Sequence, residues 1–185
     1  VFNPSQLDAE QWVLAAKSFD AKHLVFSTKH HNGFCLWPTK TTDYSVRSAP
    51  WKNGHGDVVR ELAEACKKHG IALGLYFSGH DRHFPCHTLD PASLANREAY
   101  WPVYRQQIEE LLTNYGEIVC LWLDLYGDPF NWEAIDPKTG RLYGDAIVAL
   151  AKAKQPKIVI WHGTKPDIHF FGNEEGTAPY PIWNV

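Results

Sequence analysis

The sequence predicts an α/β fold built on a parallel sheet, in the form of a (β/α) barrel of which this chain is a part. Strand-like apolar runs alternate with amphipathic helical segments along the whole chain. Each run is apolar through its length and polar at its C-terminal end, which is typical of parallel sheets whose sites form at that end. No GxGxxG or GxxxxGK loop follows any run, so a nucleotide site is disfavoured.

Helices are expected where apolar residues recur at helical spacing, at residues 8–19, 56–70, 94–116 and 144–156. In the second segment, Asp57 suits the N-cap and Gly70 suits the stop after the last turn. The third segment carries Pro102 near its start and is closed by Gly116.

Strands are expected at residues 23–30, 71–78, 117–124 and 157–163, with residues 167–173 as one further candidate. Five strands fall short of the eight strands in about 250 residues of a closed barrel. We therefore expect residues 1–185 to be one partial catalytic domain, roughly strands 2 to 6 of a (β/α)8, TIM-like barrel. The flanking strands and any accessory β-domain would lie outside it. The chain opens at Val1 and contains no methionine, which we interpret as a missing N-terminal part.

The composition is that of an ordinary globular domain, with 44% hydrophobic and 21% charged residues. A net charge of -3 gives the chain no attraction to nucleic acid or to an anionic membrane, and no apolar run is long enough to span a bilayer. The four cysteines form no CxxC pair, which disfavours a zinc knuckle. Eight tryptophans fit either a Trp-rich core or a protein that stacks on sugar rings.

Two carboxylate sources stand out in this pattern. Asp124 ends the apolar run CLWLD, where it either caps the next loop or serves as a nucleophile or base held by a rigid strand. Glu174 and Glu175 provide a second source, although paired glutamates on a loop can also be solvated charges. A retaining glycosidase needs two carboxyl groups about 5–5.5 Å apart, and neighbouring strand ends could bring such a pair together.

His30 and His31 follow the first strand and are adjacent in sequence. Neighbouring residues of an extended strand point opposite ways, which argues against shared metal ligation. Hydrogen bonding to sugar hydroxyls is the better interpretation, because imidazole both donates and accepts, although one of the two could be a core histidine. Trp37 either stacks on a sugar face or covers the barrel end.

Other polar and aromatic positions are open to two interpretations. Asp81 and Arg82 either form an ion pair within their loop or contact substrate. Trp122 and Trp161 lie inside strands, where core packing is the expected role.

Several motifs resemble one enzyme family. The stretch from KHHNGFCLW through TTDYSV and GDVVRELAEACKKHG resembles the start of the catalytic barrel of α-L-fucosidases, glycoside hydrolase family 29. The family pattern is close to KHHDGFxLW, then TxYSV, then DVVxE. QQIEELLTNYGEIVCLWLD resembles a second family pattern. SGHDRH and DIHFFGNEEG resemble the SPWDRN and DxRWVGNExG motifs of the branch that acts on α-1,3- and α-1,4-linked fucose.

The resemblance implies a retaining exo-α-L-fucosidase that hydrolyses α-1,3/1,4-linked fucose through a covalent glycosyl-enzyme. It makes Asp124 the nucleophile and Glu174 the acid/base, with Glu175 as second choice. The substrate-binding candidates that go with it are His30, His31, Trp37, Asp81, Arg82 and Trp183. The two histidines would contact fucose hydroxyls, with Trp37 on the apolar side of the sugar.

The resemblance also implies partners and location. The partner is a fucosylated oligosaccharide or glycoconjugate, with no nucleic acid and no membrane insertion. No metal and no organic cofactor are needed. A secreted, periplasmic or lysosome-like location is favoured.

Departures from the family pattern bear on substrate choice. The family has Asp, Trp, Gly and Arg where this sequence has Asn32, His80, Leu125 and His169. They motivate one alternative, a catalytically impaired fucose-binding homologue. A second alternative is a metal-dependent hydrolase that uses His30, His31 and Asp124.

Overall fold

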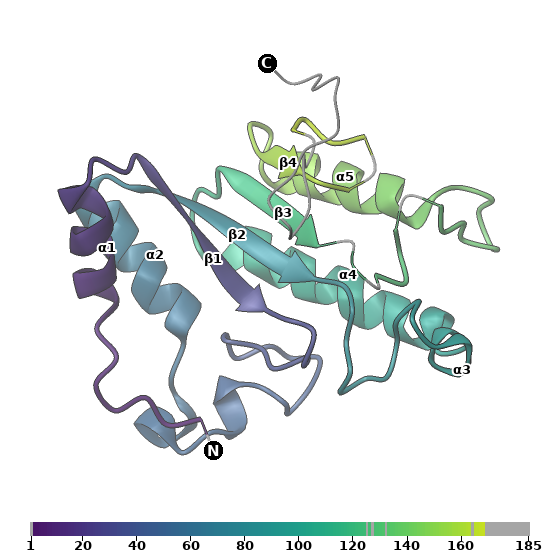
Figure 1. Ribbon diagram of the computed structural model, residues 1–185, viewed down its shortest axis with the longest axis horizontal. Helices are drawn as coiled ribbons and strands as arrows, with labels where there is room; N and C mark the ends of the chain where they lie inside the picture. Colours follow the sequence, from purple (N-terminus) through teal and green to yellow (C-terminus); the bar gives the residue numbers. More distant parts are fainter. Residues whose placement is uncertain (1, 125, 127, 132, 164, 169–185) are drawn as a thin grey trace.

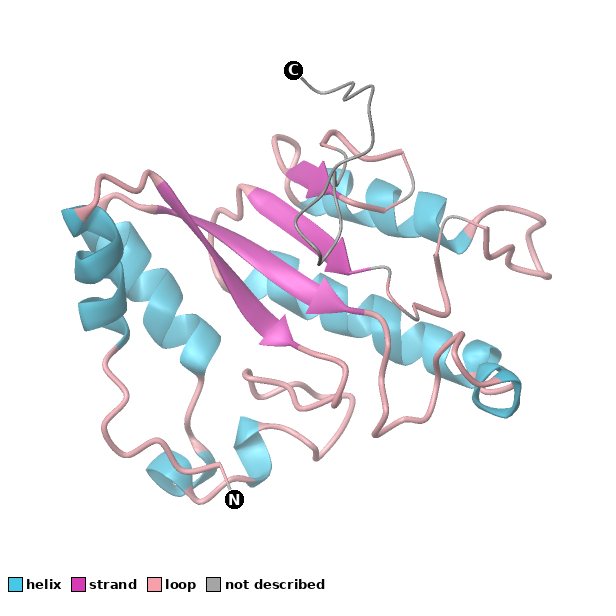
Figure 2. Ribbon diagram, viewed as in Figure 1, coloured by secondary structure: helices cyan, strands magenta, loops and turns pink. Residues whose placement is uncertain are grey.

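A four-stranded parallel sheet organises the chain. The structure is a computed structural model that describes residues 2–124, 126, 128–131, 133–163 and 165–168. The strands lie in the order β1 (His23–Lys29), β2 (Ala72–Ser78), β3 (Cys120–Asp124) and β4 (Val159–Trp161), and every neighbouring pair is parallel. The predicted parallel α/β fold is therefore confirmed, and the strands follow four of the predicted segments (Figures 1 and 2).

Helices occupy the four predicted segments, as α1 (Ala9–Ser18), α2 (Val58–His69), α4 (Arg97–Asn114) and α5 (Tyr143–Lys154). Helix α2 begins and ends as predicted, because Asp57 accepts a 2.9 Å hydrogen bond from the Arg60 N–H and Gly70 takes a left-handed φ of 70°. Helix α1 packs against α2, and α4 packs against α5. No helix within the described ranges combines the length and apolarity needed to cross a bilayer.

Three short helices lie in loops that the sequence left unassigned: η1 (Val46–Ser48), η2 (Trp51–Gly54) and α3 (Pro91–Leu94). Segments of three or four residues are too short to show a period. The fifth strand candidate reaches Ile168, which makes a single bridge with Trp161, and residues 169–173 lie outside the described residues. Closure of the sheet into a barrel stays a prediction.

The two faces of the sheet differ in burial. On one face Leu75, Leu121 and Ile160 are fully buried in the main core, together with apolar side chains of α1, α2, α4 and α5. On the other face, Trp122 and Trp161 are only half-buried and stack with ring centroids 4.3 Å apart. The expectation that these two tryptophans belong to the core was wrong, because they line the open face that also carries Asp124.

A shift in the β1–β2 register turns the Lys29 side chain to the opposite face of the sheet. Strand alternation alone would place Lys29 on the same face as Ser27. The β1–β2 register shifts between these two residues, so that Lys29 pairs with Phe77 instead. An irregularity of this kind turns a side chain to the opposite face. The Lys29 side chain therefore enters the buried layer between the sheet and α4, where it contacts Asp81 and Tyr100.

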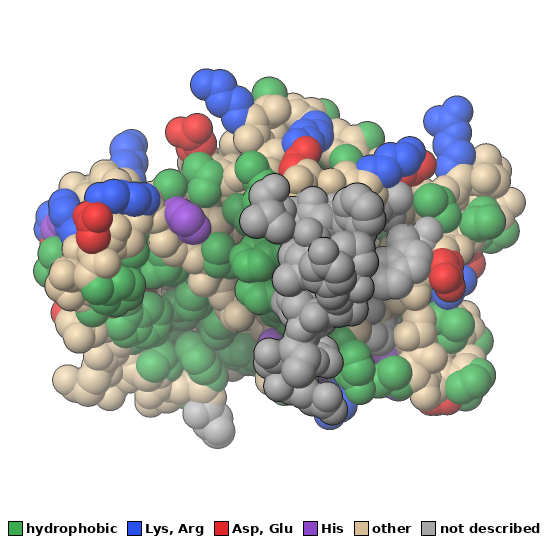
Figure 3. Space-filling model, turned by 45° about the horizontal axis from the view of Figure 1, so that its top comes forward, with side chains coloured by type: hydrophobic (Ala, Val, Ile, Leu, Met, Phe, Trp, Pro, Cys, Tyr) green, Lys and Arg blue, Asp and Glu red, His purple; other side chains and the backbone are tan. Residues whose placement is uncertain are grey.

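Charged side chains of both signs are interspersed on the face shown in Figure 3, where Lys and Arg project from the upper rim. Hydrophobic side chains gather below them. Some large apolar side chains are exposed on α1 and just beyond it, including Trp12, Leu14 and Phe19.

Candidate active site

Polar side chains from three strands meet at the C-terminal edge of the sheet. Asp124 is the last residue of β3 and is paired in register with Ser78, the last residue of β2. His30 and His31 directly follow β1. Parallel strands place their carboxyl ends at one edge, so these side chains converge as the sequence predicted.

Two donors fix the Asp124 carboxylate. The Tyr76 hydroxyl donates to Oδ2, and the Tyr126 N–H donates to Oδ1 at 3.0 Å. The second contact closes the turn after β3, which is the capping role that the sequence offered as one alternative, and the catalytic role of Asp124 stays a prediction. The side chain is still 21% exposed, which leaves the carboxylate open to a ligand.

The hydrogen bonds of Ser78 fix the tautomer of His31. The Ser78 hydroxyl donates to the His80 carbonyl at 3.1 Å, so its oxygen accepts from the His31 Nδ1–H at 2.7 Å. Partial burial lowers the pKa of His31, helped by the nearby His30 and Arg82 and opposed by Asp124. The neutral ring therefore turns the lone pair of Nε2 towards Asp124 Oδ2, 3.7 Å away.

His30 lies beside His31, which corrects the prediction that adjacent histidines point opposite ways. The ring centroids are 4.1 Å apart. The alternation rule does not apply, because β1 ends at Lys29 and the chain turns at His31. The exposed His30 ring stacks on Tyr76 with an interplanar angle of 13°.

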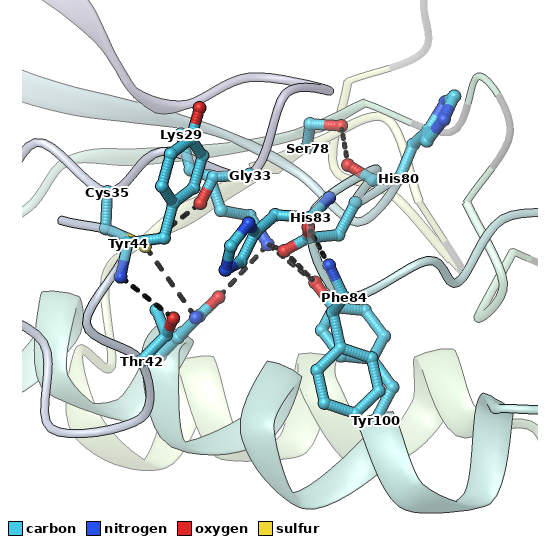
Figure 4. A network of polar contacts seen from close by, with 12 residues as sticks. Lys29, Gly33, Cys35, Thr42, Tyr44, Ser78, His80, His83, Phe84 and Tyr100 are labelled. Atoms are coloured by element: carbon cyan, nitrogen blue, oxygen red, sulfur yellow. Dashed lines mark hydrogen bonds and ion pairs between the residues drawn. The ribbon is translucent and has the colours of Figure 1, made fainter. Parts of the chain in front are cut away.

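His80 lies buried behind this cluster. Its ring stacks on His31 with centroids 4.8 Å apart and makes a tilted contact with the His87 ring at 4.5 Å, and the residue is 0% exposed. Burial, followed by the neighbouring histidines, lowers the pKa of His80 to about 4, so the ring is neutral at physiological pH. Within the described part of the chain neither ring nitrogen has a hydrogen-bond partner. In Figure 4 the His80 ring points away from the polar network around Lys29.

Asp81 is buried and pairs with Lys29 rather than with Arg82. The Lys29 ammonium donates to Asp81 Oδ2 at 3.1 Å and to Gln107 Oε1 at 3.1 Å. It also donates to the Tyr100 hydroxyl at 2.6 Å, and Lys29 and Tyr100 are both labelled in Figure 4. Burial alone would raise the pKa of Asp81, but Lys29 and two backbone N–H donors outweigh it and lower the pKa. Both sequence-based alternatives for Asp81, a loop ion pair with Arg82 or a substrate contact, were therefore wrong.

The Lys29 network also supports the loops around the site. Asp81 Oδ1 accepts 2.9 Å bonds from the N–H groups of His83 and Phe84, and the Arg82 N–H donates to the His31 carbonyl at 2.9 Å. The Arg82 side chain is exposed. Gly33 has a φ of +85°, and a Cβ there would lie 2.2 Å from Asp81 Oδ1, so only glycine lets this loop pass.

Trp37 does not belong to the cluster. Its side chain is 1% exposed within the main core, and its Nε1–H donates to Glu110 on α4 at 2.9 Å. A ring with no exposed face cannot stack on a sugar, so the assignment of Trp37 as a substrate wall was wrong.

Some sequence-based assignments lie outside the described residues. They are Glu174, Glu175 and Trp183, and the departures Leu125 and His169. Asn32 is described, and its Oδ1 accepts from the Phe34 N–H at 3.0 Å. An aspartate could accept the same bond, so the exchange preserves the local turn.

Sequence reasoning missed two residues of the site region. Tyr76 contacts Asp124. The sequence could have indicated this, because alternate residues of a strand share a face and Tyr76 therefore lies on the same face of β2 as Ser78. Asp128 is fully buried beside Gly79, where an added Cβ would lie 2.2 Å from its carboxylate. Burial raises the pKa of Asp128 to about 7, against hydrogen bonds from Phe130 and Tyr104 that lower it. No sequence signal marked Asp128.

Comparison with known proteins identifies the family. The sequence model of α-L-fucosidases matches residues 1–176. The chain belongs to the α-L-fucosidase family. It is 43% identical to α-L-fucosidase 1 of Arabidopsis thaliana over 100% of its own length and 34% of that protein. A glycoside hydrolase 29 member from a rumen bacterium has 38% identity and a TM-score of 0.79 over 95% of this chain and 32% of its own.

The α-L-fucosidase of Lactobacillus casei, solved in complex with α-L-fucose product, is more distant. It has 28% identity and a TM-score of 0.71 over 86% of this chain and 52% of its own. The chain thus spans about a third of the length of the curated fucosidases that it matches first.

Proposed function

We propose that the complete protein is a retaining exo-α-L-fucosidase acting on fucosylated oligosaccharides or glycoconjugates. The observation that carries the proposal is Asp124, a partly exposed carboxylate at the end of β3 that Tyr76 and Tyr126 fix and His31 faces. A strand-end carboxylate fixed in this way suits nucleophilic attack, because its orientation is set before substrate binds.

The reaction would have two steps. In the first, an oxygen of Asp124 bonds to the anomeric carbon as the bond to the leaving oxygen breaks, and Glu174 gives that oxygen its proton. In the second, Glu174 takes a proton from water, the water oxygen bonds to the anomeric carbon, and Asp124 leaves. The role of Glu174, with Glu175 as second choice, rests on the resemblance of the NEEG segment to the family motif.

We expect the substrate to contact the two hydrogen-bond acceptors that face each other at the site, His31 Nε2 and Asp124 Oδ2. The unprotonated Nε2 of His31 can accept from a sugar hydroxyl, and exposed His30 can donate or accept beside it. Arg82 lies exposed at the rim. The apolar side of the sugar, which the sequence assigned to Trp37, is better matched by half-buried Trp122 on the open face, with Trp183 kept as a candidate.

The proposal also covers the fucosyl linkage that is cleaved and the architecture of the complete protein. The SGHDRH and NEEG segments support the α-1,3/1,4 branch by resemblance. Flanking strands of the complete protein would pair with the edges of the sheet and close a (β/α)8 barrel.

The test assays the complete protein on Lewis trisaccharides and on a 2′-linked fucoside, with an Asp124→Ala variant. We expect cleavage of the Lewis substrates only, and an activity loss on the order of 10³-fold or more in the variant. Asp43→Ala is the control, because Asp43 is an exposed aspartate whose partner is Arg47. Equal cleavage of both substrates would contradict the branch, and unchanged activity of Asp124→Ala would contradict the nucleophile.

The catalytically impaired homologue remains the second candidate, and His80 favours it. His80, whose two ring nitrogens have no hydrogen-bond partner among the described residues, stacks on His31 at the position where the family motif has tryptophan. Fucose binding without turnover in the complete protein would support this alternative.

A further inference from the structure

His30, His31 and Asp124 each offer one ligand atom, and these atoms all lie within 4.8 Å of one another. We propose that the three residues bind a divalent transition-metal ion such as Zn²⁺, and that this ion inhibits the enzyme by occupying the substrate site. The ion is an inhibitor and not a cofactor. Its binding stands on the geometry alone, whereas its inhibitory effect rests on the proposed function.

The donor set selects the class of ion. Two imidazole nitrogens and one carboxylate oxygen suit Zn²⁺ or Cu²⁺, whereas Mg²⁺ and Ca²⁺ prefer oxygen ligands. Three protein ligands with an open fourth position are typical of zinc sites that exchange water or ligand. Among the described residues, His30, His31 and Asp124 are the group of three potential metal ligands whose ligand atoms lie close enough together to share one ion.

The spacing between His31 and Asp124 is close to what an ion requires. Bond lengths of about 2.0 Å at a tetrahedral angle place two ligand atoms about 3.3 Å apart. His31 Nε2 and Asp124 Oδ2 are 3.7 Å apart, so a shift of a few tenths of an ångström satisfies this geometry. Both atoms are electron-pair donors, and a cation between them relieves their mutual repulsion.

Outer contacts already orient the ligands. Ser78 accepts from Nδ1 of His31, which leaves Nε2 free for the metal, and Tyr76 and Tyr126 orient the Asp124 carboxylate. Metal-binding histidines typically donate their other N–H in this way. The exposed Arg82 side chain opposes a cation, which limits affinity but leaves the ligand atoms free.

The experiment uses the complete protein, freed of metal with a chelator that is then removed. Zn²⁺ is titrated by calorimetry, and Co²⁺ is titrated by its visible absorption. We expect one ion per chain, bound at least tenfold more weakly by His30→Ala and His31→Ala. His23→Ala is the matched control, because His23 is an exposed histidine at the opposite end of β1, and it should bind as the wild type does. Absence of one-to-one binding, or equal affinity in all three variants, would overturn the site.

Kinetics separate the metal site from the proposed function. We expect the metal-free enzyme to be active and Zn²⁺ to raise the apparent KM for fucoside with kcat unchanged, reversibly on adding chelator. Binding that leaves KM unchanged in an active enzyme overturns the inhibitory role. Activity that is lost with the metal and restored by Zn²⁺ also overturns it, in favour of a metal-dependent hydrolase. Metal binding by a protein without fucosidase activity supports the site and counts against the proposed function alone.

Discussion

Nε2 of His31 faces Oδ2 of Asp124 across 3.7 Å, and both atoms are hydrogen-bond acceptors when the ring is neutral. No direct hydrogen bond can join them in that state. A group placed between them must therefore donate a hydrogen bond or carry a positive charge. A sugar hydroxyl satisfies the first condition and a divalent cation the second, so one relationship underlies both proposals.

Removing the Tyr76 hydroxyl tests how Asp124 is oriented. Tyr76→Phe loses a hydrogen bond to a charged group, which is worth about 1.5–3 kcal/mol. We expect kcat to fall roughly ten- to a hundredfold, with a smaller change in KM, because the carboxylate is less well oriented for attack.

Tyr115→Phe is the matched control for this prediction. The Tyr115 hydroxyl also donates to an aspartate, Asp57 at the start of α2, at 3.0 Å. Its loss should lower stability without changing the kinetics. Equal kinetic effects of the two exchanges would show that Tyr76 does not act through Asp124.

The buried Lys29–Asp81 pair should contribute to folding. Lys29→Met leaves the Asp81 carboxylate buried without its cation, which costs about 3–5 kcal/mol in unfolding free energy. Adding Asp81→Asn should recover part of that loss, because the buried charge is gone. Denaturant unfolding of the complete protein measures both. Lys68→Met is the control, since the Lys68–Glu10 pair is exposed and its loss should change the unfolding free energy little. A double variant no more stable than Lys29→Met would contradict this account.

Asp128 should make the protein less stable as pH rises. Its pKa is about 7 in the fold against an ordinary value of 3.8, so between these values the folded state holds a proton that the unfolded state has lost. Stability from this group is therefore present below pH 4 and is lost as pH rises towards 7, with a slope of at most about 1.4 kcal/mol per pH unit. Asp128→Asn should remove this slope in thermal melts recorded between pH 4 and 7. A curve identical in shape to that of the wild type would contradict the raised pKa.

His80 should act in the opposite direction. Its pKa is about 4 in the fold and 6.5 ordinarily, so the unfolded state holds the extra proton between these values. Stability from His80 is present above pH 6.5 and is lost as pH falls to about 4. His80→Phe keeps a flat ring for the stack and removes the titration, so its stability should fall less than that of the wild type on acidification. His55→Phe, a change at an exposed histidine, is the control and should leave the curve unchanged.

The pattern of apolar residues predicted the strands and helices, because the buried part of each segment has to be apolar. The run at residues 71–78, which is apolar until Ser78, predicts a buried strand, and β2 forms there with all but its first residue buried. The strand-end rule likewise placed Asp124 with the two histidines. These features depend on local sequence, so a single chain reveals them.

The misassigned residues depend on contacts that local sequence does not contain. Asp81 pairs with Lys29, which lies 52 residues away in the sequence and turns inward at a register shift. Trp37 is buried in the core, where Glu110, 73 residues along the chain, accepts its indole N–H. The shared direction of His30 and His31 follows from the turn after β1, where the strand period has already ended.

Trapping the covalent intermediate tests whether Asp124 is the nucleophile. A 2-fluoro-fucosyl fluoride forms the glycosyl-enzyme and slows its hydrolysis, because fluorine at C2 disfavours the oxocarbenium-like transition state of both steps. The complete protein is treated with it, digested and analysed by mass spectrometry. We expect one fluorofucosyl group per chain, attached to Asp124. A label on another residue, or an active enzyme that cleaves fucosides yet takes up no label, would contradict it.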